Sequence, residues 1–476
     1  MIIRPPMSAA RCGFFVLCAA FVLLSSSSLF AEPNLYNNSD FAAFANHWLQ
    51  TGCSSANTWC GGYDYDISGK VDAKDLYLFS ENWLKSKDHV LSDDIAAWIL
   101  HVPVPSKWNY DNSFLLLSLY EKYQQCHNPT YLKYIKDWVD ALVDSSGNID
   151  TDYYVKTKYI LDHIQPGNLL LILYKHFGTA KYKLAMDNNL IYQFNHGHKT
   201  FDGGFWHKES YPRQMWLDGL YMAEPFACGY AKMFGDPNWY DVAGHQCTLV
   251  ATHTQDTQIY PSDPARKGLC YHGWDSSHWE TPPQTPQGWA DSATGHSPEF
   301  WGRAIGWYAM ALVDCLDIMP TDHPDRPQMI TILNNLAAGI AYYQDPSTGL
   351  WWQVVDKGYP RATYPTNFTE TSCSAMFSYA IGRAVDKGYI TSDPNFYSNV
   401  AHTAFLGIYN NKLTYSGGYI SLKDTVTVGS LGGYSTYSGG YAYYTGTGSG
   451  KTTNDPKGVG AFMRAALQDE KHFTSP

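Results

Sequence analysis

The sequence predicts an all-α protein in which a ring of helical hairpins follows a small loop–helix module. From about residue 92 to residue 466, apolar residues recur at three- and four-residue spacing in segments of similar length. Short breaks rich in Gly, Pro, Asp and Asn separate these segments, and few stretches alternate as strands do. Many similar helices favour antiparallel hairpins closed around a common axis. Two similar segments near the N-terminus indicate the module.

The first residues are typical of a secretory signal peptide. Arg4 and Arg11 precede an apolar run from Phe14 to Leu24, followed by a serine cluster and Ala31. The run is too short to span a bilayer comfortably, and no later segment rivals it. We therefore expect residues 1–31 to be removed, leaving a soluble, secreted protein with no membrane segment. An uncleaved anchor is the alternative.

Length, charge and cysteine content constrain the remainder. About 445 residues after the signal suit one large domain with a small module. The net charge of −11 argues against a nucleic-acid partner, so an acidic substrate would need a local basic patch. The 16 Trp and 37 Tyr suit sugar rings, although aromatic residues also fill cores. Cys53 and Cys60 are close enough in sequence to pair, whereas the later cysteines lack metal spacing.

Residues 32–84 are predicted to form the small module. Ser39–Leu49 and Lys74–Leu84 repeat as short amphipathic helices, each ending in Trp-Leu. A loop with the oxygen spacing of an EF-hand precedes the second helix, with Gly69 at its sharp turn. Its expected calcium ligands are Asp64, Asp66, Ser68, the backbone carbonyl of Lys70, Asp72 and Asp75. The alternative is a solvated acidic turn, and calcium is expected to be structural only.

The two repeats resemble a dockerin module, in which paired calcium loop–helix units bind a cohesin partner. The first copy departs from this pattern, because residues 33–38 offer mainly asparagines instead of an acidic loop. The resemblance therefore implies a cohesin-like or other surface scaffold partner for the module. Residues 85–91 are interpreted as a linker.

Residues 92–476 form the predicted main domain. Its expected helices are Asn112–Tyr123, Pro129–Val143, Pro166–His176, Ala180–Gln193, Met215–Phe234, Trp239–His253, Phe300–Leu316, Met329–Gln344, Ser372–Val385 and Phe396–Tyr409. A Gly-, Tyr- and Ser-rich stretch, Ser416–Gly450, interrupts this pattern. It is interpreted as a long surface loop or small hairpin, with a functional lid as the alternative.

One segment, residues 203–222, is denser in reactive side chains than any other. A glycine-led loop contains His207 and Lys208, and a Trp-Leu-Asp-Gly motif with Trp216 and Asp218 then opens an apolar helix. An Asp at this position is a candidate catalytic acid, although helix capping is its commonest role.

Three further segments combine polar donors, indoles and glycines. They contain the candidate residues Asp162, His272, Trp301, Arg303 and Trp307. Loops at one end of a helix ring would converge, so the basic side chains could bind a carboxylate while indoles stack on sugars. The alternative is that the histidines are structural and the tryptophans pack helices. Metal catalysis is disfavoured because no HExxH spacing occurs, and no nucleophile elbow or phosphate loop is present, so we expect no catalytic cofactor.

Taken together, the motifs resemble glycoside hydrolase family 105. They are GGFWHK, QMWLDGLYMAEPF, YHGWD, FWGRAIGWYAMALVD, TGLWWQVVD, ETSCSAMFSYAI and GVGAF, in this order across the main domain. The resemblance implies an (α/α)6 barrel with its site at one mouth. It also implies an enzyme that releases a terminal 4,5-unsaturated uronic acid from oligosaccharides made by a lyase, of the unsaturated rhamnogalacturonan or ulvan type, by hydrating the C4=C5 double bond.

The resemblance also implies residue roles. Asp218 matches the general acid/base and Asp162 its partner carboxylate, whose like charge would favour protonated Asp218. Expected substrate contacts are His207, Lys208, Trp216, His272, Trp301, Arg303, Trp307 and, in Lys-Trp-Asn-Tyr-Asp, Trp108. A polysaccharide lyase or ordinary hydrolase on the same barrel, and a sugar-binding protein without activity, are the competing interpretations.

Overall fold

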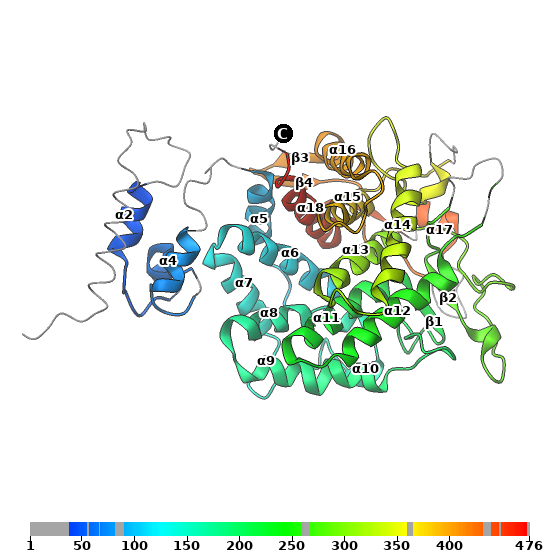
Figure 1. Ribbon diagram of the computed structural model, residues 1–476, viewed down its shortest axis with the longest axis horizontal. Coiled ribbons are helices and arrows are strands. Elements are labelled where there is room, and N and C mark those ends of the chain that lie inside the picture. Colours follow the sequence, from blue (N-terminus) through cyan, green and yellow to red (C-terminus); the bar gives the residue numbers. More distant parts are fainter. Residues whose placement is uncertain are drawn as a thin grey trace, which may run out of the picture. The chain divides into compact units, whose positions relative to one another are not determined.

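The computed structural model describes residues 38–54, 57–65, 67–80, 90–258, 260, 267–358, 365–431, 439–446 and 449–473. The chain divides into two compact units, Met1–His89 and Val90–Pro476 (Figure 1). The predicted signal peptide lies outside the described residues, as do residues 85–89 of the predicted linker. Across the described part of the chain, no helix has both the length and the apolar character needed to cross a bilayer.

The N-terminal unit is built around a pair of short helices. It contains α2 (Asn38–Asn46), α3 (Thr58–Gly62) and α4 (Ala73–Ser80). Phe44 of α2 stacks on Phe79 of α4 with ring centroids 5.1 Å apart, so the aromatic positions of the two repeats form one small core. A disulfide joins Cys53 to Cys60.

The acidic loop of this unit closes on its own backbone. The buried carboxylate of Asp64 accepts hydrogen bonds from the backbone N–H groups of Ser68 and Gly69, both at 2.9 Å. Asp75, also buried, accepts from Tyr65 and Asp72. Asp66 lies outside the described residues, and the described ones bring no three His, Cys, Asp or Glu side chains together as metal ligands. The loop therefore has an EF-hand-like turn, and the described residues do not by themselves supply a calcium cage.

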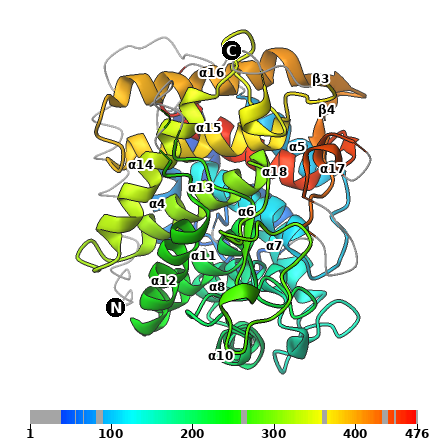
Figure 2. The same ribbon diagram turned by 90° about the vertical axis from the view of Figure 1, so that its right-hand side faces the viewer.

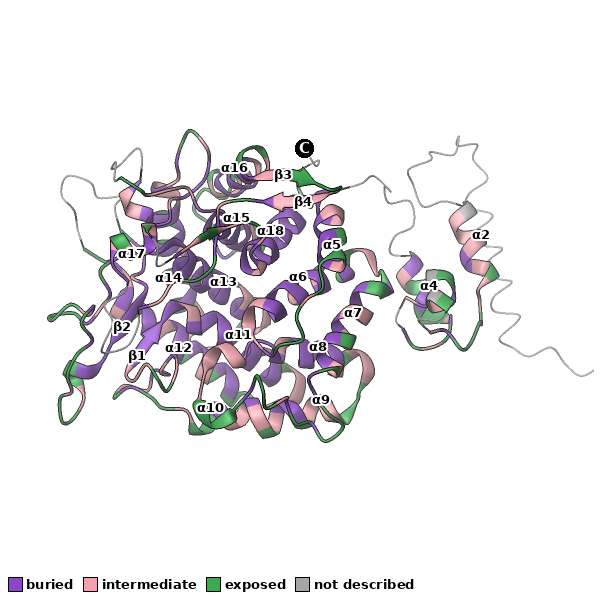
Figure 3. Ribbon diagram, turned by 180° about the vertical axis from the view of Figure 1, so that it is seen from behind, coloured by how far each residue is buried: buried purple, intermediate pink, exposed green. Residues whose placement is uncertain are grey.

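The large unit is an (α/α)6 barrel. Its inner helices contact one another in ring order, α6–α8–α11–α13–α15–α18 and back to α6 (Figure 2). Their bounds are Tyr110–Cys126, Gly167–Phe177, Leu217–Phe234, Gly302–Ile318, Thr371–Asp386 and Pro456–Asp469, in that order. Figure 3 shows these helices largely buried. Six outer segments cover them: α5 (Leu91–His101), α7 (Pro129–Asp140), the run α9–η4–α10 (Ala180–Ala185, Met186–Ile191 and Tyr192–His196), α12 (Asn238–Thr254), α14 (Arg326–Tyr342) and α16 (Pro394–Lys412).

Two helices of the ring are absent from the ten predicted segments. Helix α5 begins at Leu91, inside the predicted linker, where Asp93 accepts a hydrogen bond from the backbone of Val90. Helix α18 contains Gly458 and Gly460, which lower helix propensity and weaken the periodic signal. A Cβ at Gly460 would lie 2.9 Å from the Phe114 ring, so this glycine allows close packing of α18 on α6.

Two predicted helix starts are wrong, for the same physical reason. Gln214–Trp216 forms strand β1, paired antiparallel with β2 (Gly273–Asp275), so α11 begins only at Leu217. Trp301 is likewise held outside α13 by a β-bridge to Val354. In both places long-range backbone pairing replaces the first turn that local periodicity predicts.

Short pairs of strands also occur in the late Gly-, Tyr- and Ser-rich region. They are β3 (Leu413–Ser416) with β4 (Tyr419–Leu422), and β5 (Thr425–Val426) with β6 (Lys451–Thr452). A short helix, α17 (Tyr441–Thr445), lies between β5 and β6. A small hairpin is therefore present at β3–β4, and its first strand lies before the predicted stretch except for Ser416.

The long connections all run from an outer helix to the start of an inner helix. As a result the six inner helices begin at the same mouth, and the segments that precede α8, α11, α13, α15 and α18 meet there. The partial positive charge of each helix N-terminus faces this mouth, which favours negatively charged groups.

Candidate active site

Asp218 is the second residue of α11, at the mouth where the inner helices begin. The β1–β2 pairing brings His272 to it, and the backbone N–H of Leu217 donates to the His272 carbonyl at 2.9 Å. His272 Nε2 lies 3.0 Å from Asp218 Oδ2, with the ring fully buried and the carboxylate 14% exposed. The approach is bent, so neither atom has a well-aligned hydrogen-bond partner among the described residues. Asp218 is thus not the N-cap, and its side chain faces a histidine.

The glycine of the Trp-Leu-Asp-Gly motif is required by crowding behind Asp218. A Cβ at Gly219 would lie 2.9 Å from a methyl carbon of Leu161 and 3.2 Å from His207 Nδ1. The absence of a side chain therefore lets the segments that contain Asp162 and His207 approach the start of α11.

Asp162 is held by two neighbouring basic residues. It lies in η3 (Leu161–His163), with its carboxylate 2.7 Å from Lys208 Nζ and 3.6 Å from His207 Nε2. Burial alone would raise the pKa of Asp162, but the charge of Lys208, joined by that of His207 in the acidic range where His207 is protonated, outweighs burial and holds this pKa below its ordinary value. Asp162 is therefore an ionised carboxylate whose charge is largely balanced by Lys208, which weakens the like-charge effect on Asp218 expected from the sequence.

His207 is a neutral residue in this site. Burial, opposed by Asp162, lowers the pKa of His207 to about 4. Its ring stacks on Trp216 with centroids 4.5 Å apart, and its backbone N–H donates to Gln214 at 2.8 Å. At neutral pH His207 therefore carries no positive charge.

The depressed pKa of His207 predicts acid sensitivity. The unfolded chain takes up this proton near pH 6.5 and the folded chain only near pH 4, so the unfolding free energy falls as pH drops between these values. The expected loss from pH 7.5 to pH 5 is about 2 kcal/mol for this residue. Urea unfolding at both pH values checks it, with His207→Gln expected to show a smaller decrease. An unchanged decrease in that variant would assign the acid sensitivity elsewhere.

Aromatic rings and Arg303 complete the mouth. The Trp216 ring lies between the rings of His207 and Tyr211 and stacks on both. The centroids of the Trp216 and Tyr211 rings are 4.9 Å apart. The Arg303 guanidinium lies 5.0 Å from the centre of the Trp301 ring, and its Nη1 donates to the Val426 carbonyl. Apart from Tyr211, which is half-buried, these side chains are almost fully buried, so the wall is ordered by contacts within the protein.

Two of the predicted substrate contacts have other neighbours. Trp108 is fully buried and donates from Nε1 to the His163 carbonyl at 2.9 Å, which supports the turn that contains Asp162. Trp307 is buried against Phe114 and Tyr221 between the inner helices. The structure thus brings Asp162, His207, Lys208, Trp216, Asp218 and His272 into one cluster and places Trp108 and Trp307 in the packing around it.

Sequence reasoning missed Tyr110 and Tyr444. Tyr110 is the first residue of α6, and burial, then the charge of Asp162 and to lesser extents those of Asp111 and Asp218, raises its pKa well above the ordinary value. The signal for Tyr110 was in the Lys-Trp-Asn-Tyr-Asp segment, two residues after Trp108. Tyr444 contacts His272 from the late Tyr-rich stretch, where repeated tyrosines obscure any single candidate.

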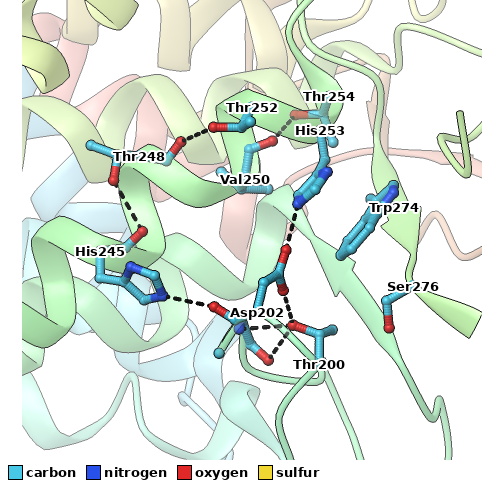
Figure 4. A network of polar contacts seen from close by, with 12 residues as sticks. Thr200, Asp202, His245, Thr248, Val250, Thr252, His253, Thr254, Trp274 and Ser276 are labelled. Carbon is cyan, nitrogen blue, oxygen red and sulfur yellow. Dashed lines mark hydrogen bonds and ion pairs between the residues drawn. The ribbon is translucent and has the colours of Figure 1, made fainter. Parts of the chain in front are cut away.

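A polar network supports β2 (Figure 4). Trp274, at the centre of this strand, stacks on His253 of α12 with ring centroids 3.5 Å apart. His253 Nε2 lies 2.7 Å from Asp202 Oδ2, and the Thr200 hydroxyl donates to the other oxygen at 2.6 Å. Because Trp274 pairs with Met215 across the ladder, this network fixes the strand immediately before Asp218.

The arrangement is suited to acid–base chemistry on a sugar. One carboxylate is ionised and paired with lysine, and the other faces a histidine within an aromatic mouth. An (α/α)6 barrel with two carboxylates at one mouth is consistent with a glycoside hydrolase. In agreement, residues 85–473 match the model of Glycosyl Hydrolase Family 88, and the chain belongs to this family.

Individual relatives are consistent with this assignment. The chain is 33% identical to Protein Atu3128 of Agrobacterium fabrum over 247 residues, which are 51% of this chain and 96% of that protein. It is 22% identical to the unsaturated rhamnogalacturonyl hydrolase YesR of Bacillus subtilis over 58% of this chain and 70% of YesR. A family 105 glycoside hydrolase structure from C. acetobutylicum aligns with a TM-score of 0.72 and 32% identity, over 80% of this chain and all of that one.

Proposed function

We propose that this glycoside hydrolase releases the terminal 4,5-unsaturated uronic acid from oligosaccharides produced by a polysaccharide lyase. The observation that supports this most is the pairing of Asp218 with His272 beside the Asp162–Lys208 ion pair, at the mouth toward which the inner helix N-termini point. Helix N-termini, Lys208 and Arg303 suit an anionic sugar. The relative YesR, named as an unsaturated rhamnogalacturonyl hydrolase, supports the same substrate class.

The proposed reaction needs only one acid/base group. The unsaturated sugar is a vinyl ether, with C4=C5 attached to the ring oxygen and conjugated to the carboxylate. Asp218 donates its proton to C4, which leaves an oxocarbenium-like cation at C5 and the ring oxygen. Water then attacks C5 and gives its proton to the Asp218 carboxylate, and the resulting hemiketal opens and releases the neighbouring sugar. Because the anomeric carbon is not attacked, the carboxylate-separation rule for retaining and inverting enzymes does not apply.

Ultraviolet absorbance of the conjugated double bond tests this function. Unsaturated disaccharides from rhamnogalacturonan and from ulvan should lose absorbance with the enzyme, and the faster substrate identifies the polysaccharide. A lyase would instead raise the absorbance of intact polysaccharide, and binding without turnover would indicate a sugar-binding protein. Unchanged absorbance with both disaccharides from folded protein would contradict the proposal.

We also propose that the protein is secreted and that its N-terminal module binds calcium and presents its helices to a cohesin-like or surface partner. The basic and apolar N-terminus and the Cys53–Cys60 disulfide support an oxidising compartment. Mass spectrometry of protein recovered from the culture medium should find cleavage near Ala31. Calorimetric calcium binding should be lost in Asp64→Asn, while a chelator should leave kcat unchanged; heat of binding retained in that variant would contradict the loop assignment.

A further inference from the structure

Tyr444 contacts the histidine that faces the catalytic acid. Its hydroxyl lies 2.6 Å from His272 Nδ1, although the two residues are 172 positions apart in sequence. Both side chains are fully buried, and the other ring nitrogen of His272 faces Asp218 at 3.0 Å. Tyr444, His272 and Asp218 therefore form a continuous line of polar groups from α17 to the start of α11.

The position of Tyr444 is determined by further contacts. Its ring stacks on Trp301 with centroids 5.2 Å apart and an interplanar angle of 12°. The side-chain amide of Gln353 donates to the backbone carbonyl of Tyr444 at 3.1 Å and to the Ser449 hydroxyl at 3.0 Å. These contacts hold the hydroxyl against the imidazole independently of any bound sugar.

We propose that Tyr444 is a positioning residue that selects the tautomer of His272. In a neutral imidazole one nitrogen donates and the other accepts, and a phenol is a better donor than the ring nitrogen it meets. With Tyr444 donating to Nδ1, the ring proton lies on Nε2, the nitrogen that is 3.0 Å from Asp218 Oδ2. The acid proton of Asp218 is then kept on Oδ1, from which it can be transferred to C4 of the sugar.

The opposite tautomer would work against catalysis. If Nδ1–H donated to Tyr444, the Nε2 lone pair would face Asp218 and would hold the carboxyl proton in an O–H···N bond. In the proposed tautomer, Nε2–H also stabilises the carboxylate that remains after the proton reaches C4. This role rests on the proposed hydration reaction, whereas the tautomer itself does not depend on the substrate.

Kinetics of Tyr444→Phe test the role. This variant keeps the ring that stacks on Trp301 and removes only the hydroxyl. We expect kcat to fall about 10- to 100-fold with KM little changed and the pH profile of kcat altered. Tyr441→Phe is the matched control, because Tyr441 lies on the same short helix and its hydroxyl binds the Pro365 carbonyl. In a His272→Gln background, whose amide can donate without tautomers, Tyr444→Phe should have little further effect; additive losses would overturn the proposal.

Nitrogen-15 spectra of histidine-labelled protein provide a test that needs no substrate. The His272 ring signals are identified by their absence in His272→Gln. Protonated Nε2 and bare Nδ1 are expected in the wild type, with a mixture of tautomers in Tyr444→Phe. A proton on Nδ1 in the wild type would overturn the proposal. An inactive wild type that still shows Nε2–H would reject the hydration reaction and leave the assignment of Tyr444 to the tautomer intact.

Discussion

Replacement of Asp218 by asparagine is expected to reduce kcat by about 10² to 10⁴ while the unsaturated disaccharide still binds. The amide has nearly the same shape as the carboxyl group, so it can remain opposite His272 and disturb neither Gly219 nor α11. It cannot supply the proton that C4 requires or take one from water. Absorbance kinetics measure the loss of turnover, and calorimetry with the same disaccharide measures binding.

Asp241→Asn is the matched control for this prediction. Asp241 also lies in the first turn of a long helix, but on the outer helix α12, with 69% of its side chain exposed. Loss of one negative charge at a helix start is therefore common to both variants, and activity should be lost only in Asp218→Asn. Near-normal kcat in Asp218→Asn would require another proton donor. Loss of both binding and cooperative unfolding would instead point to a structural role for Asp218.

The barrel could be predicted because hydrophobic periodicity in a bundle of long helices is a local property. Each of the ten expected segments matches a helix or helical run to within three residues at each end, and two of them begin on residues that pair with distant backbone. Met215 and Trp301 are apolar residues at helical spacing whose backbone pairs far away in sequence, Met215 with strand β2 and Trp301 in an isolated bridge to Val354. Backbone pairing over such distances leaves no trace in a local pattern.

The site was predictable where a motif contains the whole local geometry. The Trp-Leu-Asp-Gly motif includes the acid, the indole that stacks on His207 and the glycine that lets the segments approach. By contrast, the neutral state of His207 follows from burial, which only the folded chain determines. The contact of Tyr444 with His272 joins residues 172 positions apart, and a tyrosine-rich stretch gives no reason to prefer one ring.

The opposite mouth of the barrel also contains charged groups that are invisible to sequence motifs. There the C-terminal halves of the inner helices line a cavity of about 850 Å³. Arg464 of α18 lies beside it and is only 4% exposed. Its guanidinium lies 2.7 Å from Glu121 of α6 and 2.9 Å from Asp314 of α13, and it donates to the hydroxyls of Tyr379 and Tyr221. One side chain on α18 thus joins four other inner helices of the ring.

Replacement of Arg464 by methionine is therefore expected to lower the unfolding free energy by about 3–5 kcal/mol. The methionine fills much of the space but leaves the carboxylates of Glu121 and Asp314 without their shared cation. Burial already raises the pKa of Glu121 despite Arg464, so loss of the arginine should favour its protonated form further. Urea unfolding near neutral pH measures the effect, and kcat at low temperature should change little because the site lies at the other mouth.

Two comparisons separate this ion cluster from general packing. Lys183→Met removes a partly exposed pair with Asp187 and should cost less than about 1 kcal/mol. Glu121→Gln and Asp314→Asn, added to Arg464→Met, should restore part of the stability, because neutral amides need no counter-ion. The loss of unfolding free energy in Arg464→Met should also become smaller as the pH falls, because protonation neutralises the carboxylates of Glu121 and Asp314. If neither the added substitutions nor a lower pH reduced this loss of unfolding free energy, lost packing and not uncompensated charge would be what destabilises the ring.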